Sequence, residues 1–161
     1  MVRRYWLLKS DPETFGLEHL RRSARQTTVW DGVRNYQARN YLRDEIRQDD
    51  GVLFYHSQVQ PPEVVATARV VRAGYPDPTQ FLTKGPGHDP KASKAEPRWF
   101  AVDIRLDRVF SRPVTLVELR ETPGLEKMAL LRKGSRLSVQ PVTPAEWKIV
   151  TRLGRRSSPA L

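Results

Sequence analysis

The sequence predicts a single α+β domain in which a mostly antiparallel sheet curls into a small barrel with helices at its ends. Two segments alternate between apolar and polar residues, which is typical of antiparallel strands that bury one face. Helical patterns fall irregularly between the strands, which argues against regular βαβ alternation. The length of 161 residues fits one domain with a hydrophobic core of its own.

Short strands and helices share the first part of the chain. Residues 5–9 and 51–56 are aromatic or aliphatic and predict short, buried strands. Residues 17–22 predict a short helix, and residues 35–47 predict a longer one, because apolar side chains recur at helical spacing. The apolar stripe of the longer helix consists of Ala38, Leu42 and Ile46.

The two alternating segments supply the antiparallel strands. In residues 64–71, the side chains expected to face the core are Val64, Ala66, Ala68 and Val70, and those expected to face solvent are Thr67 and Arg69. In residues 99–109, the apolar face consists of Phe100, Val102, Ile104 and Leu106, and the polar face consists of Asp103, Arg105 and Asp107.

The last part of the domain contains a long loop, two helix starts and a final strand. Residues 74–97 are rich in Pro, Gly, Lys and Asp and predict a functional or mobile loop. Thr115 and Thr143 each begin a capping-box pattern and predict helix starts, with a strand over residues 137–142 between them. We expect the domain to span residues 1–153 and residues 154–161 to form a basic, disordered tail.

Charge and composition narrow the function classes. The sequence has 28 Lys and Arg residues and 18 Asp and Glu residues, which give a net charge of +10. Such a charge is typical of a protein that binds a polyanion, but it can also serve only to keep the protein soluble. No apolar run is long enough for a membrane span or a signal peptide, so we expect a cytoplasmic protein without a membrane partner. With no cysteine and three widely spaced histidines, we expect neither a cofactor nor a metal.

Residues 29–40 form the most informative stretch. An aromatic residue, a turn, an acid, two arginines and three amides fall within this dozen residues, and a flat apolar face beside hydrogen-bonding groups suits a nucleobase. Further polar-aromatic patches lie at strand ends, over residues 9–11, 55–57 and 136–140. Such ends can converge at one rim of a small barrel, so we predict a recognition pocket there.

Each patch also has an ordinary structural interpretation. Trp30 could plug the core, because tryptophan is mostly buried, and His56 could be a structural histidine. A hydrolytic set could be written from Ser10, Ser57 or Ser138 with His56 and Asp31, although no nucleophile elbow accompanies it. A zinc deaminase is excluded in practice, because its metal ligands include cysteines.

Taken in order, these patches resemble the EVE domain, in its stand-alone bacterial type. The resemblance runs from Tyr5 to about Leu153, and the block over residues 30–40 is its most specific part. Asp11 stands where glutamate is common in this family. The other matching segments are residues 5–12, 54–57, 75–78, 113–116 and 137–142. The resemblance implies a PUA-like pseudo-barrel, related to YTH and ASCH domains, with a mixed, mostly antiparallel curled sheet and flanking helices.

The resemblance also implies a site for a modified base, because family members are implicated in flipping modified bases, notably cytosines in DNA, into a pocket. Trp30 is then expected to be the cage tryptophan, and Lys9 and Ser10 the base-contacting strand end. The other expected positions are a rim of Asn35, Tyr36 and Arg39, an opposite wall of Tyr55, His56 and Ser57, and a floor of Ser138 and Gln140.

The sequence therefore favours a non-catalytic, monomeric reader of a modified nucleobase in DNA or RNA. Asp31 is expected to complete the base pocket, and the expected phosphate contacts are Arg34, Arg39 and Arg136. The alternative is a small ASCH-like amidohydrolase acting on a modified nucleoside, with an apparatus of Lys9, Ser10 and Asp31 or Asp11. A protein-interaction module that uses the same cleft is a third hypothesis.

Overall fold

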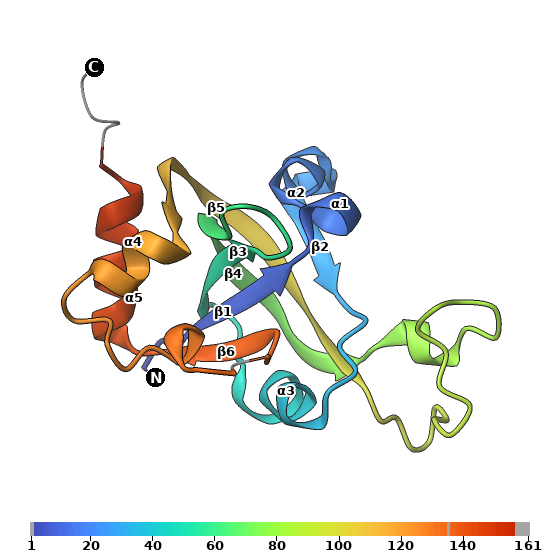
Figure 1. Ribbon diagram of the computed structural model, residues 1–161. Helices are drawn as coiled ribbons and strands as arrows, with labels where there is room; N and C mark the ends of the chain where they lie inside the picture. Colours follow the sequence, from blue (N-terminus) through green and yellow to red (C-terminus); the bar gives the residue numbers. More distant parts are fainter. Residues whose placement is uncertain (1, 135, 157–161) are drawn as a thin grey trace.

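A computed structural model describes residues 2–134 and 136–156, and its centre is one six-stranded sheet in the order β2-β5-β4-β3-β1-β6 (Figure 1). Strands β1 and β3 run parallel, and the other neighbouring pairs are antiparallel. The mixed, curled sheet confirms the predicted α+β class, although it is not closed into a barrel. The strands are β1 (Tyr5–Ser10), β2 (Thr27–Trp30), β3 (Gly51–His56), β4 (Glu63–Pro76), β5 (Phe100–Thr115) and β6 (Val139–Val142).

Both faces of the central strands are buried. On β1, Trp6 and Leu8 belong to one hydrophobic core, and Leu7 between them belongs to a second core. Strand β3 divides in the same way, with Phe54 in the first core and Tyr55 in the second. Because successive strand residues point to opposite faces, the continuous apolar runs in β1 and β3 serve two cores.

Helices lie at opposite ends of the sheet. Helices α1 (Pro12–Phe15) and α2 (Leu17–Arg22) lie near β2, and helices α4 (Leu116–Glu121) and α5 (Pro144–Gly154) lie at the far end (Figure 1). The two predicted helix starts are confirmed. The Thr115 hydroxyl accepts from the Glu118 amide, and Thr143 and Glu146 form a full capping box. Most of the tail expected over residues 154–161 lies outside the described residues.

The helix predicted over residues 35–47 is shorter than predicted, and it changes from α-helical to π-helical hydrogen bonding. Helix α3 spans Tyr36–Asn40, and a π-helical turn over Tyr41–Glu45 comes next, in which the Ile46 amide donates to the Tyr41 carbonyl at 2.9 Å. This wide turn keeps Leu42 and Ile46 in the core. Strand β4 crosses close beneath it, since a Cβ at Gly74 would lie 2.3 Å from the Leu42 carbonyl oxygen. Tertiary packing therefore reshapes a helix that periodicity alone predicts as regular.

Strand β4 differs from the predicted alternation at its first residues. The register shifts between Val64 and Ala66, so Val64 joins the second core while Ala66, Ala68 and Val70 stay in the first. Thr67 is buried, and its hydroxyl donates to the Asp107 carboxylate at 3.4 Å. The predicted alternation of residues 100–106 is confirmed on β5. None of the helices in the described part of the chain is long and apolar enough to cross a membrane.

Candidate nucleic-acid site

A cleft of about 570 Å³ lies where the end of β1, helix α1 and the end of β2 meet. Its wall combines three segments that are far apart in the sequence, and the Lys9 amide joins two of them by donating to the Ser138 carbonyl at 2.9 Å. Three of the four predicted patches thus contribute to one cleft. The lining residues are Lys9, Ser10, Asp11, Thr14, Phe15, Thr28, Val29, Trp30, Asp31, Gly32, Val33, Arg34 and Ser138.

The cleft holds a partly buried amine and a carboxyl group. Burial lowers the pKa of the Lys9 ammonium. Burial raises the pKa of the Asp31 carboxyl, and the neighbouring Asp77 charge adds to that rise. The charged form of each group is therefore less stable in the cleft than it is in water.

Trp30 lines the cleft, but it does not present a flat, exposed face. Its side chain is 8% exposed and makes edge contacts with Phe15 and Phe54, at centroid distances of 6.4 and 5.6 Å. The tryptophan belongs to the first core. The core-plug interpretation therefore describes most of this side chain, and only its margin borders the cleft.

Ser10 lines the cleft, whereas the predicted wall residues His56 and Ser57 lie outside its lining and bond to the backbone of neighbouring segments. The Ser10 hydroxyl donates to the Phe15 carbonyl, and the Ser57 amide and hydroxyl both donate to the Ser10 carbonyl. The Leu17 amide donates to His56 Nε2 at 3.1 Å, and burial lowers the pKa of this histidine. His56 Nε2 thus accepts a hydrogen bond from the backbone rather than from a serine hydroxyl.

Two other predicted pocket residues lie outside the cleft. Tyr55 is 4% exposed and lies in the second core, because adjacent residues of β3 point to opposite faces. Gln140 is buried, donates to the Leu137 carbonyl and borders a separate hollow of about 300 Å³. Arg136 is exposed and borders the same hollow.

The predicted rim residues Asn35, Tyr36 and Arg39 also lie outside the cleft lining. Asn35 caps α3, since its Oδ1 accepts from the Ala38 amide at 3.0 Å. The Tyr36 ring stacks on Trp99 at a centroid distance of 4.9 Å, and the Arg39 guanidinium lies 4.9 Å from the Tyr36 centroid. Arg39 also donates to the Arg98 carbonyl at 2.9 Å. These residues fasten α3 to the end of the long loop.

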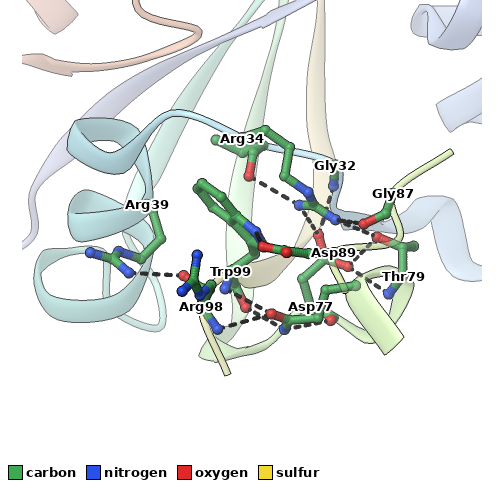
Figure 2. Close-up of polar contacts among 11 residues, drawn as sticks. Gly32, Arg34, Arg39, Asp77, Thr79, Gly87, Asp89, Arg98 and Trp99 are labelled. Carbon is green, nitrogen blue, oxygen red and sulfur yellow. Dashed lines mark hydrogen bonds and ion pairs between the residues drawn. The ribbon is translucent and has the colours of Figure 1, made fainter. Parts of the chain in front are cut away.

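Arg34 joins the cleft wall to the long loop (Figure 2). Its guanidinium donates to the fully buried Asp77 carboxylate at 3.1 Å, to the Thr79 hydroxyl at 3.0 Å and to the Gly87 carbonyl at 2.6 Å. The Gly32 amide also donates to Asp77, at 2.8 Å. Burial alone would raise the pKa of Asp77, but the hydrogen bonds from Thr79, Gly32 and Arg34 outweigh burial and hold it below its ordinary value.

Gln80 fixes the two ends of the same loop. This fully buried amide donates to the carbonyls of Asp77 and Trp99, and its oxygen accepts from the amides of Arg98 and Trp99 at 2.9 and 3.0 Å. Sequence reasoning missed Asp77 and Gln80, because they lie in a segment whose composition indicates only a loop, and it missed Trp99, because this residue begins a segment whose alternation indicates only a strand. The -Asp-Pro-Thr- turn signal at Asp77, which caps the 3-10 turn Pro78–Phe81, is the one local clue.

The comparisons with known proteins agree with this architecture. A family model described as the EVE domain matches residues 4–153. Thymocyte nuclear protein 1 of Mus musculus is 39% identical over 165 residues, which cover 92% of this chain and 73% of that protein. The chain belongs to the EVE domain family.

Solved structures of related proteins share the fold. This EVE domain is 36% identical to the human THYN1 protein solved in complex with 5-methylcytosine containing DNA, with a TM-score of 0.88 over 96% of this chain and 99% of that one. The YTH domain of Zygosaccharomyces rouxii MRB1, solved with N6-methyladenosine RNA, has a TM-score of 0.54 at 16% identity, covering 97% and 89% of the two chains. At that identity the likeness shows the fold alone.

Proposed function

We propose that this EVE domain binds a modified base of DNA in the cleft between β1 and β2. The cleft itself carries the proposal: its volume of about 570 Å³ falls within the range of about 300–1,000 Å³ common for small-ligand sites, and apolar and charged groups share its wall. The likeness to human THYN1, whose structure holds 5-methylcytosine containing DNA, supports a methylated cytosine as the first ligand to test.

The lining chemistry suits a modified cytosine. The exocyclic amine of cytosine donates hydrogen bonds, and the Asp31 carboxylate can accept one. The Lys9 ammonium can donate to the ring nitrogen or carbonyl oxygen of the base. Phe15 and the margin of Trp30 supply an apolar wall against which an added methyl group would leave water. In this proposal the polar pair reads the base edge and the apolar wall favours the modification.

The proposed activity is binding without catalysis. The Ser10 hydroxyl is engaged with the Phe15 carbonyl, and the Leu17 amide occupies His56 Nε2. Neither group is arranged as a nucleophile beside its base, which a hydrolase of the serine type requires. The human THYN1 structure, which holds 5-methylcytosine containing DNA, also supports a binding function.

The phosphate-binding surface in this proposal centres on the segment before β6. The guanidinium groups of Arg34 and Arg39 already bond to the long loop, whereas Arg136 is exposed, as are Arg132 and Lys133. These three cations line the hollow of about 300 Å³ that adjoins the cleft, since Leu137 borders the hollow and Ser138 borders the cleft. Phosphates held here would keep a flipped base within reach of Lys9.

Fluorescence anisotropy with matched oligonucleotides tests the proposal. Strands of one sequence that carry cytosine, 5-methylcytosine or another modified base at one position are titrated with protein. We expect tighter binding to a modified base, and we expect Lys9→Met and Asp31→Asn each to remove the preference. Lys148→Met, at a lysine on α5 far from the cleft, is the matched control and should keep it. Equal affinity for all the strands would refute the proposal.

A further inference from the structure

A second, smaller hollow adjoins the candidate cleft. Its volume is about 240 Å³, and Asp31, Gly32 and Arg34 form part of its wall and part of the wall of the cleft. The opposite wall comes from the long loop, through Thr79, Leu82, Gly85, Pro86 and Gly87. The cleft and the hollow beside this loop thus share the wall formed by Asp31, Gly32 and Arg34.

Leu82 is the exposed apolar side chain on this tip. It is 55% exposed, and the polar and charged Thr83 and Lys84 that come after it are exposed as well. A single exposed leucine is ordinary on a protein surface. Here, however, it lines a hollow that shares part of its wall with the cleft proposed to receive a base.

The loop that carries Leu82 is held firmly on the domain. Arg34 bonds to Thr79 and Gly87 on either side of the leucine (Figure 2). The Leu82 amide donates to the Thr79 carbonyl at 3.3 Å. The buried Gln80 joins the loop to the start of β5. An apolar group that must enter a base stack needs such support, because a mobile side chain would lose more conformational freedom on insertion.

We propose that Leu82 enters the duplex in place of the base that the cleft receives. The inference rests on the proposed function. A base that leaves a duplex gives up its stacking, and an apolar side chain inserted into the gap restores apolar contact with the neighbouring bases. Because the hollow that Leu82 lines shares the wall of Asp31, Gly32 and Arg34 with the cleft, the leucine and the cleft can serve the vacated stack and the flipped base together.

Binding to duplex and single-stranded DNA separates this role from base recognition. We compare Leu82→Ala with the parent chain on 5-methylcytosine oligonucleotides, with 2-aminopurine next to the modified base as a fluorescent reporter of unstacking. We expect the variant to bind the duplex at least about tenfold more weakly and to brighten the reporter less, with unchanged affinity for the single strand. Leu82→Met should restore duplex binding, and Val117→Ala, at a similarly exposed apolar residue on α4, should bind like the parent.

Three results would overturn the inference. One is equal duplex affinity for Leu82→Ala and the parent chain. Another is an equal loss on single strands, which would make Leu82 part of the base contact. A third is tighter binding of the parent chain to RNA that carries the same modified base. Failure of the proposed function gives a different result, because the parent chain then shows no preference for the modified base even in a single strand.

Discussion

Arg34 donates to Asp77 at 3.1 Å across 43 residues of sequence, and this pair connects the wall of the candidate cleft to the long loop. The carboxylate is fully buried, and the guanidinium side chain is 27% exposed. The sequence predicts Arg34 as a phosphate contact and Asp77 as part of a loop. In the structure, the two side chains instead form an ion pair that holds the fold together. Its removal should affect both the cleft and the loop.

Arg34→Ala should destabilise the protein by about 3 kcal/mol, because it leaves the buried Asp77 carboxylate without its partner. The lower end of the usual range applies, since the arginine keeps partial access to water. Denaturant unfolding measures the loss. Arg34→Lys should recover little of it, because an ammonium cannot reproduce the fork to Asp77, Thr79 and Gly87. A lysine variant as stable as the parent would contradict this account.

The same carboxylate predicts a pH dependence. The folded pKa of Asp77 lies below its ordinary value of 3.8, so its stabilising contribution is complete above that value and is lost as the pH falls through the folded pKa. Unfolding free energies of the parent chain and Asp77→Asn, measured at a series of pH values, should differ most near neutral pH. The difference should shrink below about pH 4. A constant difference across this range would show that the charge of Asp77 is not the stabilising feature.

Trp30→Ala should lower the unfolding free energy by about 3–5 kcal/mol, because loss of a buried aromatic side chain leaves a cavity against Phe15 and Phe54. Trp30→Phe should cost less, since a ring remains to fill part of the site. Binding assays on the alanine variant should therefore be interpreted together with thermal unfolding. An alanine variant that is as stable as the parent chain and loses only DNA binding would contradict this account. That result would support the stacking role that the family resemblance implies for Trp30.

Arg136→Gln should weaken DNA binding to a similar degree for modified and unmodified strands. Loss of one phosphate contact should reduce the slope of log K against log salt concentration by about one. Binding isotherms at several salt concentrations give this slope. Arg152→Gln, an exposed arginine on α5, is the control and should leave the slope unchanged. If both variants gave the same slope, Arg136 would not be a phosphate contact.

Local sequence patterns predicted the elements well, because period, capping and β-propensity act over a few residues. The strand over residues 51–56 and the helix over residues 17–22 have the predicted bounds. The predicted loop is only partly a loop, since β4 continues to Pro76 and Gln80 fixes the segment between β4 and β5. The four hydrogen bonds of the Gln80 side chain join residues up to 19 apart, and no short pattern indicates them.

The candidate site was predictable in part for the same reason. Patches at the ends of β1 and β2 do meet at one cleft, although three strands separate β1 from β2 in the sheet, and no local pattern in the sequence indicates that meeting. Tyr55 does not join them, since one step along β3 moves a side chain to the other core. Arg34 and Arg39 resemble phosphate ligands in sequence, and only the folded loop shows the carbonyls to which they donate.

Amide NMR spectra of the chain, recorded during titration with a single strand that carries 5-methylcytosine, test the central claim most directly. We expect the largest shift changes at residues 9–15, at residues 28–34 and at Ser138, with smaller changes for the same strand carrying cytosine. Changes confined to another surface, such as the hollow lined by Ala24, Thr27 and Arg105 beside β2 and β5, would contradict the account. Identical spectra for the two strands would contradict it equally.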